Sequence, residues 1–246
     1  MMDFLKDRRS IRKYTSQPVD DELLTRLLEL ASRSSTTGNM QLYSVIITRS
    51  EEKKQALAPA HFNQPMLTGA PVVLTFCADF NRFNKWCEQR NAVPGYNNFQ
   101  SFITALIDAV IFAQTFCVAA EREGLGICYI GTTTYNPNTI IDILEIPRHV
   151  TPVITITLGY PAEMPPQPDR LPAKAWIHRE TYKEYSPEKI NEIYVGKESL
   201  PESLKFIAEN AKETLAQVFT DIRYTKANNE RFSEILLKTI REQGFL

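Results

Sequence analysis

The sequence lacks the short motifs that assign a nucleophile, a metal ion or a nucleotide loop. It contains no GxSxG, no P-loop and no GxGxxG. Its three histidines, His61, His149 and His178, have no metal-ligand spacing, and its four cysteines form no CxxC pair. We therefore expect no metal site, no disulfide and no catalytic side chain, and the cysteine pattern favours a reducing cytoplasm.

The chain also lacks an excess of charge of either sign. It has 28 Lys and Arg against 29 Asp and Glu in 246 residues, so its formal net charge is −1. Such a balance provides no general attraction to nucleic acid. The N-terminus MMDFLKDRRS also lacks the apolar run of a secretory signal. We expect neither a nucleic-acid partner nor a membrane partner.

Apolar periodicity and turn residues predict helices alternating with strands. Asp20 is expected to cap a first helix, whose leucines recur at helical spacing up to Ala31. We predict strands at 43–48, 71–77, 127–130 and 151–158, and further helices at 51–58, 102–123 and 138–145. This order places the body of the chain among α/β or α+β layer folds.

The segment 102–123 is the longest apolar pattern in the chain and is apolar on nearly every side. A helix of this kind must be buried. Thr104, Asp108 and Gln114 interrupt the pattern, which argues against a membrane span. We interpret it as a central helix that is shared between the core and a dimer partner.

Three other segments have weaker patterns. Residues 81–98 are polar and aromatic, and we predict a mobile loop there, either a substrate lid or an ordinary surface loop. The proline-rich run 161–172 is predicted to be extended. Beyond residue 186 the chain is mostly helical, and Ser199 with Glu202 predicts a capping box that begins a long amphipathic helix.

A cluster of positive charge stands out near the N-terminus. Four of the eight residues in DRRSIRKY, at 7–14, are cationic. Guanidinium groups suit a phosphate better than lysine does, because they offer paired donors in a fixed fork. The alternatives are a solvated surface, or a nucleic-acid or membrane patch, and the overall charge balance argues against that patch.

Two other segments have the composition of ligand-binding loops. SRSSTTGNMQ, at 32–41, is rich in hydroxyl and amide groups and lies between a predicted helix and a predicted strand. LGICYIGTTT, at 125–134, places Gly131 where a backbone can approach another group closely. Either segment, taken alone, is also typical of an ordinary connection.

In the order in which they occur, these pieces resemble the FMN-dependent nitroreductase family, in its larger oxygen-insensitive, NADPH-preferring type. The resemblance is carried by RRSIRKYTSQPVDDELLTRLLELA, STTGNMQ, FCADF, EREGLGICYIG and VTPVITITLGYPAEMPPQPDRLP, and spans roughly residues 4–182. It implies an α+β, three-layer α/β/α fold with a central, mostly antiparallel sheet flanked by helices. It also implies an FMN-binding core at 1–185 and a helical C-terminal extension at 186–246.

The resemblance further implies a set of cofactor-binding residues. Arginines and a serine would hold the FMN phosphate, a further arginine would lie toward the ribityl chain and pyrimidine edge, and polar residues and a backbone turn would bound the ring. The phosphate residues are Arg8, Ser10 and the distal Arg170, with Arg9 helping to make up the charge there, and the arginine toward the ribityl chain is Arg12. The polar residues are Thr36, Thr37, Asn39 and Gln64, and the turn is Ile130–Gly131, which would face flavin N5. Pro168 stands where relatives frequently have a lysine.

The function that the resemblance implies is a cytoplasmic, homodimeric oxidoreductase. NADPH or NADH would reduce FMN and leave, and a planar nitroaromatic or quinone would then be reduced in a ping-pong cycle. The flavin would carry the chemistry, so no catalytic side chain is required. The alternative is a flavin-binding module, or a member with other electron chemistry such as dehalogenation. Arg223, Lys226 and Arg231 are candidates for the 2′-phosphate of NADPH, or form a solvated helix face.

Overall fold

The computed structural model describes residues 5–246, and the chain divides into two compact units. The first unit comprises the chain up to Pro165 together with Phe232–Leu246, and the second is Pro166–Arg231. The predicted parts, 1–185 and 186–246, divide the chain elsewhere, and that functional division stays a prediction. Each compact unit is described here by itself.

A four-stranded antiparallel sheet forms the centre of the first unit. Its strands have the order β1-β2-β4-β3, with β3 at one edge. The strands are β1 (Tyr43–Thr48), β2 (Val72–Asp79), β3 (Gly126–Ile130) and β4 (Val150–Gly159). All four lie within two residues of their predicted bounds.

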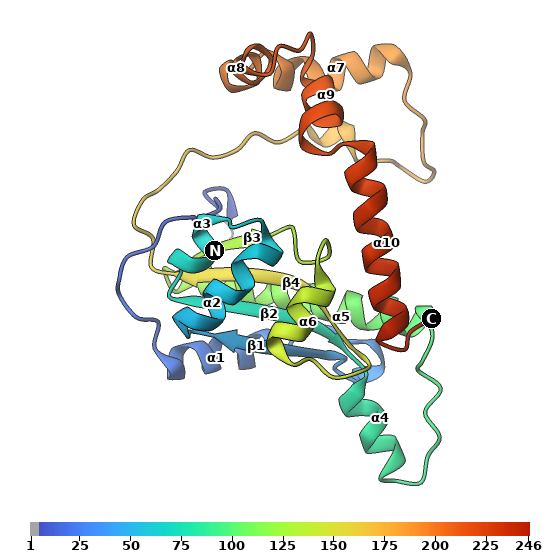
Figure 1. The fold of residues 1–246 in the computed structure, drawn as a ribbon. Helices are drawn as coiled ribbons and strands as arrows, with labels where there is room; N and C mark the ends of the chain where they lie inside the picture. Colours follow the sequence, from blue (N-terminus) through green and yellow to red (C-terminus); the bar gives the residue numbers. More distant parts are fainter. Residues whose placement is uncertain (1–4) are drawn as a thin grey trace. The chain divides into compact units, whose positions relative to one another are not determined.

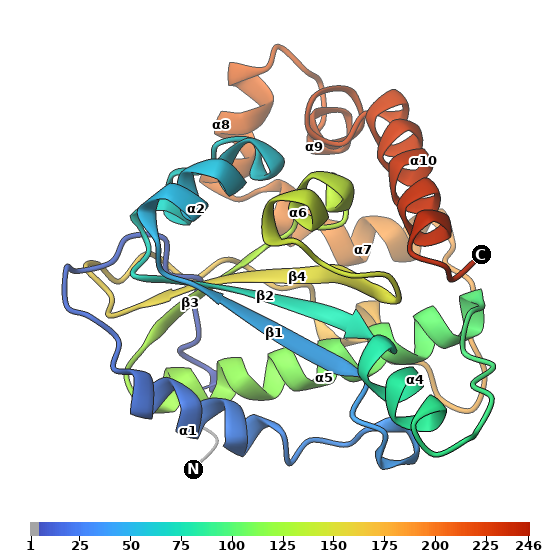
Figure 2. The same ribbon diagram turned by 60° about the horizontal axis from the view of Figure 1, so that its bottom comes forward.

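Helices cover both faces of this sheet. Alternate residues of β2 enter different cores, because successive side chains of a strand point to opposite faces. Leu74 and Phe76 lie in the core beneath α1 (Asp21–Ala31) and α5 (Phe99–Arg122), whereas Val73 and Cys77 lie in the core beneath α2 (Glu51–Leu57) and α6 (Pro137–Leu144). Figures 1 and 2 show these layers on the two sides of the sheet. The predicted three-layer fold is confirmed.

The starts of α1 and α5 follow from capping side chains. The Asp20 carboxylate accepts hydrogen bonds from the backbone N–H groups of Glu22 and Leu23, at 2.9 and 3.0 Å, as predicted. The Asn98 side chain accepts from the Ser101 N–H at 3.0 Å, so α5 begins three residues earlier than the apolar pattern indicates. Both caps satisfy amides that have no partner inside the helix.

Among residues 5–246, α5 is the one helix long and apolar enough to cross a membrane by length and composition. In the structure it packs on the sheet. Its Phe112 ring stacks on Tyr43 of β1 with ring centroids 4.1 Å apart, and Phe116 lies 5.9 Å from Phe76 of β2. This helix is therefore part of the core.

The prediction of a loop at 81–98 is wrong for the first half of that segment. Residues Asn81–Glu88 form the helix α4. The Asp79 carboxylate accepts a hydrogen bond from the Arg82 N–H at 3.3 Å, and Phe80 stacks on Tyr96 with ring centroids 4.9 Å apart. Phe83 packs against both of those rings. The aromatic residues Phe80, Phe83 and Trp86 recur every three positions, which is a helical spacing. The polar residues between them make this spacing easy to miss in the sequence.

Several further elements precede the last helix. In the first unit they are the 3₁₀ turns Thr37–Asn39 and Ala58–His61 and the helix α3 (Pro65–Gly69); in the second they are the turn Ala173–Ala175, α7 (Pro187–Glu198), α8 (Pro201–Glu209), α9 (Leu215–Gln217) and the π-turn Val218–Arg223. Residues 161–172 contain no helix and no strand beyond one isolated bridge, as predicted.

The capping box predicted at Ser199 and Glu202 is wrong. Ser199 follows the end of α7, and its hydroxyl donates to the Gly196 carbonyl at 3.1 Å. Leu200 precedes α8 without a side-chain cap, and Pro201 begins that helix. Proline suits a first helical position because its missing N–H would have no partner there. The segment is a helix of nine residues instead of a long one.

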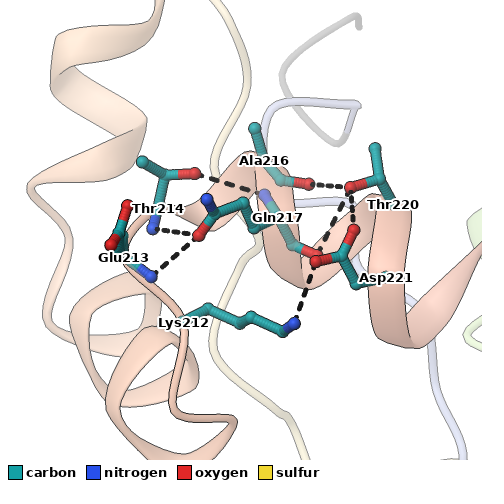
Figure 3. A network of polar contacts seen from close by, with 7 residues as sticks. All are labelled: Lys212, Glu213, Thr214, Ala216, Gln217, Thr220 and Asp221. Atoms are coloured by element: carbon teal, nitrogen blue, oxygen red, sulfur yellow. Dashed lines mark hydrogen bonds and ion pairs between the residues drawn. The ribbon is translucent and has the colours of Figure 1, made fainter.

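A capping box does occur later in the second unit (Figure 3). The Thr214 hydroxyl accepts from the Gln217 N–H at 3.2 Å, while the Gln217 side-chain oxygen accepts from the Thr214 N–H at 3.3 Å and from the Glu213 N–H at 2.8 Å. Lys212 binds the Asp221 carboxylate at 2.9 Å, which lowers the pKa of Asp221. These contacts define the turn before the last helix.

The long helix of the C-terminal region is α10 (Lys226–Glu242), and its last turns belong to the first unit. The His149 N–H donates to the Gln243 carbonyl at 2.9 Å. Phe245 is fully buried, with its ring 5.7 Å from that of Phe102. Phe245 is thereby packed against the first turn of α5.

Candidate functional site

The basic segment at 7–14 is attached to the edge of the sheet by close packing. The Ile11 N–H donates to the Ile127 carbonyl of β3 at 2.9 Å, and the Ile11 side chain is buried. A Cβ atom at Gly126 would stand 2.7 Å from side-chain atoms of Ile11. Only glycine lets the segment approach β3 this closely.

Tyr14 fixes the other end of the segment. Its hydroxyl lies 2.7 Å from the Thr157 hydroxyl and donates to the Ile11 carbonyl at 2.7 Å. Burial raises the pKa of Tyr14 far above its ordinary value. A Cβ at Gly159 would come within 2.9 Å of the Tyr14 ring, so a second glycine admits this anchor. The backbone that carries Arg8 to Arg12 is therefore held by the sheet.

Arg8 and Arg9 line one cavity of about 300 Å³, beside the end of α5 and the start of β3. Arg8 Nε lies 3.2 Å from the Glu121 carboxylate. Arg9 donates from Nη1 to the Pro165 carbonyl at 3.2 Å and from Nε to the Asp7 carbonyl at 2.9 Å. Burial raises the pKa of Glu121, and the Arg8 charge partly opposes that shift. The cavity thus contains two guanidinium groups, one of which forms an ion pair with a carboxylate.

Ser10 and Arg12 complete this end of the site. Ser10 is half-buried and Arg12 is exposed. Burial raises the pKa of the Cys128 thiol of β3, and the positive charge of Arg12 partly opposes that shift. We call Arg8, Arg9, Ser10 and Arg12 the basic end of the site.

A second group of predicted residues meets at the other end of β3. The Gln64 amide nitrogen donates to the His61 carbonyl at 3.1 Å and to the Thr132 hydroxyl at 3.4 Å. The His61 ring nitrogen Nδ1 lies 3.0 Å from the same hydroxyl. Thr132 follows the turn Ile130–Gly131 directly, so the structure brings Gln64 and this turn together. We call His61, Gln64, Gly131 and Thr132 the amide end of the site.

His61 is fully buried, and burial lowers its pKa to about 4. Its imidazole is therefore neutral near neutral pH. Its second nitrogen, Nε2, is buried and has no hydrogen-bond partner within residues 5–246. Gly131 lies at the surface, and a Cβ there would meet no atom within 4 Å. A ligand edge can therefore reach the Gly131 backbone without obstruction.

The loop with Thr36, Thr37 and Asn39 is held by α5. The Asp108 carboxylate accepts from the Thr37 N–H at 2.9 Å and from the Thr37 hydroxyl at 3.1 Å, and its other oxygen accepts from the Leu42 N–H at 3.2 Å. Asn39 has a left-handed φ of 56° and is exposed. The Thr37 hydroxyl thus helps to hold the loop on α5 by donating to Asp108, whereas the exposed Asn39 side chain is open to a ligand.

The Thr36 hydroxyl is buried and has no hydrogen-bond partner in the part of the chain that the structure describes. An unpaired buried hydroxyl is costly unless another group satisfies it. Among residues 5–246, the Thr36 hydroxyl is thus a buried donor and acceptor of this loop that a ligand could satisfy.

Arg170 belongs to the second unit. Its Nη1 donates to the Asp169 carbonyl at 2.8 Å, and it lines a cavity of about 340 Å³ together with Lys174 and Lys197. Lys197 binds the Asp169 carboxylate at 2.8 Å. A phosphate clamp that combines Arg170 with Arg8 stays a prediction.

The edge strand β3 connects the basic end to the amide end. Its five residues rise about 3.3 Å each, so the two ends are on the order of 15 Å apart along the strand. Such a surface suits an elongated ligand with an anionic group at one end and a polar, planar group at the other. The described residues contain no group of three His, Cys, Asp or Glu side chains that could hold a metal ion.

Four residues of the candidate site were not predicted from the sequence. Glu121 and Thr132 have no distinguishing pattern, and His61 stands out only through its rarity. Asp108 did have a signal, because a carboxylate inside an apolar helix needs partners when that helix is buried. The sequence shows the interruption but does not show that the partners are Thr37 and Leu42.

Comparisons with known proteins show the family to which the chain belongs. A family model described as Nitroreductase family matches residues 5–160. An FMN reductase (NAD(P)H) of Bacillus subtilis (strain 168) is 37% identical over 180 residues, with 72% of each chain covered. The oxygen-insensitive NADPH nitroreductase of Salmonella typhimurium is 32% identical over 181 residues, with 74% of each chain covered. A solved structure of a candidate oxidoreductase from Bacteroides fragilis NCTC 9343 is 60% identical, has a TM-score of 0.98 and is covered in full, as is this chain. The chain therefore belongs to the nitroreductase family, as its motifs predict.

Proposed function

We propose that this protein is an FMN-dependent NAD(P)H oxidoreductase that reduces nitroaromatics or quinones in a ping-pong cycle. The observation that carries the proposal is the placement of the basic end and the amide end at opposite ends of one edge strand, in a chain of this family. The names of the relatives support the class of reaction, since they are an FMN reductase and an NADPH nitroreductase.

The residues present fit FMN. Arg8, Arg9, Ser10 and Arg12 would hold the phosphate and ribityl chain, because charge-assisted bonds from guanidinium groups to phosphate are among the strongest available. Gln64 and the open backbone at Gly131 would hold the polar edge of the ring. The chemistry that FMN supplies in such a site is reversible acceptance of a hydride equivalent.

The protein's own groups favour that chemistry electrostatically. Reduced flavin is anionic, so a cation toward its pyrimidine edge would stabilise it, and Arg12 is the member of the basic end that would lie on that side. The neutral His61 adds no charge of its own, and its bond to Thr132 fixes the turn after Gly131. Binding and electrostatic preorganisation are therefore the roles of the side chains.

We also propose that the protein is a homodimer in a reducing cytoplasm. Ile107, Val110 and Ile111 on α5 are exposed to 51%, 41% and 37% and lie on one face of the helix. Apolar stripes of this kind are typical of interfaces. The four cysteines are free and buried, which suits a reducing compartment. Sedimentation at micromolar concentration tests the dimer, and a monomer would contradict it.

An absorption spectrum tests the function directly. The purified protein should be yellow or should take up added FMN, and NADPH added without oxygen should bleach it. Steady-state oxidation of NADPH should then require menadione or nitrofurazone as acceptor. A colourless protein that does not take up FMN would contradict the proposal. A yellow protein without coupled turnover would instead favour a flavin-binding module.

A further inference from the structure

Three aromatic rings gather beside the amide end of the site. Phe62 meets Tyr135 edge-on with ring centroids 6.3 Å apart, and meets Phe232 edge-on at 5.8 Å. Tyr135 and Phe232 stack with centroids 4.5 Å apart and an interplanar angle of 12°. All three belong to the first compact unit. We call Phe62, Tyr135 and Phe232 the aromatic wall.

The Phe62 backbone has a conformation that is rare for a bulky residue. Its φ is 55°, and the following Asn63 also has a positive φ of 52°. Hydrogen bonds hold this turn, from the Phe62 N–H to the Pro59 carbonyl at 3.1 Å and from the Asn63 N–H to the Ala58 carbonyl at 2.8 Å. Backbone strain that the surroundings maintain in this way clusters at ligand sites.

Burial does not explain the strain. The Phe62 side chain is 49% exposed, whereas the other two rings are half-buried. A ring placed only to fill the core would gain from being covered. Phe62 instead meets both rings of the Tyr135–Phe232 stack in T-shaped geometry and leaves much of its surface open.

The wall is tied to the amide end through short contacts. The residue before Phe62 is the buried His61, which contacts the Thr132 hydroxyl at 3.0 Å. The Tyr135 N–H donates to the Thr132 carbonyl at 3.0 Å. Phe62, Tyr135 and the open backbone at Gly131 are therefore carried by the same two loops, and Phe232 of α10 packs against both rings.

We propose that the aromatic wall is a specificity surface that stacks planar, fused-ring acceptors, of which naphthoquinones are the simplest class. This inference rests on the proposed function and assigns its acceptor preference. A fused two-ring acceptor overlaps Phe62 with more apolar area than a single ring does. Offset and edge-on contacts between rings add attraction beyond area alone. The wall therefore discriminates by ring size.

The variant Phe62→Asn tests the proposal without adding strain, because asparagine adopts a left-handed φ more readily than phenylalanine. We expect the KM for menadione to rise about 3- to 10-fold, the scale of one lost aromatic contact. The KM for p-benzoquinone should change less than 2-fold on the same scale. The rate with ferricyanide, the KM for NADPH and the FMN content should stay unchanged. Phe62→Leu, which keeps apolar area, should give an intermediate effect.

Tyr194→Leu is a matched control, because Tyr194 is 37% exposed and belongs to α7 of the second unit. It should leave all of these values unchanged. An unchanged KM for menadione in Phe62→Asn, or an equal loss with every acceptor, would overturn the aromatic wall as a specificity surface. A wild-type protein with no FMN, or no turnover with any acceptor, would instead overturn the proposed function.

Discussion

The two ends of the candidate site are built by different forces. Steric fit places the basic end. Ile11 and Tyr14 pack so closely against Gly126 and Gly159 that a Cβ atom at either glycine would clash with them. Buried hydrogen bonds place the amide end, where Gln64 and His61 share the Thr132 hydroxyl. Packing is insensitive to pH, whereas a buried imidazole is not. The two ends should therefore fail under different conditions.

The largest expected difference between the ends is in acid. Folded His61 has a pKa of about 4, against 6.5 for an ordinary histidine, so the unfolded chain binds the proton first as the pH falls. The stability present above pH 6.5 should be lost between pH 6.5 and about 4, by about 3 kcal/mol. Urea unfolding at several pH values measures this loss.

The variant His61→Asn provides the comparison, because it removes the titration and keeps a polar atom near the position of Nδ1. Its stability should change less between pH 6.5 and 4 than that of the wild type. Glu121 has a pKa raised by burial, so its contribution runs the opposite way: it is present at low pH and is lost as the pH rises through that pKa. Equal slopes for wild type and His61→Asn would contradict the assignment.

A double-variant cycle separates the two roles of Arg8. Arg8→Gln should raise the Kd for FMN about 10- to 100-fold, which corresponds to one charged hydrogen bond of about 1.5–3 kcal/mol. It should also destabilise the apoprotein, because it removes the Arg8 charge beside the partly buried Glu121 carboxylate. Adding Glu121→Gln should restore stability but not FMN affinity.

Isothermal titration with FMN and thermal unfolding of the apoprotein measure these two quantities on the same four proteins. Recovery of FMN affinity in the double variant would show that Arg8 affects FMN binding only through its ion pair with Glu121 and not through contact with the phosphate. From sequence, the loss of Arg8 is expected to weaken FMN retention far more than it lowers the thermal stability of the apoprotein. The ion pair with Glu121 changes that expectation.

The packing at the basic end is tested by Gly126→Ala. The added methyl would stand 2.7 Å from Ile11, and overpacking of this kind costs about 1–3 kcal/mol. The segment should move away from β3, which weakens FMN binding while the menadione-to-benzoquinone preference stays constant. Gly131→Ala is the matched control, because a Cβ there meets nothing within 4 Å. Equal stability losses in the two variants would contradict steric placement.

The sequence predicts the layers of the fold well, because strands and amphipathic helices depend on local patterns. The bounds of β1 and the Asp20 cap are examples. It predicts the basic end from charge and resemblance, but it shows neither Glu121 beside Arg8 nor Asp108 beneath Thr37. Both partners lie far away along the chain, and no periodicity connects them. A capping box is predictable only when the first residue of the helix is predicted correctly. The start of the helix after Ser199 was not, so the capping box was expected at Ser199 but occurs at Thr214.

The smallest expected effect comes from removing that capping box. This change tests whether a perturbation outside the basic end and the amide end leaves both ends of the site intact. Thr214→Ala removes the hydroxyl that accepts from the Gln217 N–H, and loss of such a cap costs about 1 kcal/mol. Amide exchange should quicken at 215–223, because that turn loses its first restraint. FMN affinity and the acid slope should be unchanged, since the basic end and the amide end both lie in the other compact unit. A weaker FMN complex in Thr214→Ala would show that the two units are coupled in binding, and the comparison of the two ends would then have to include the second unit.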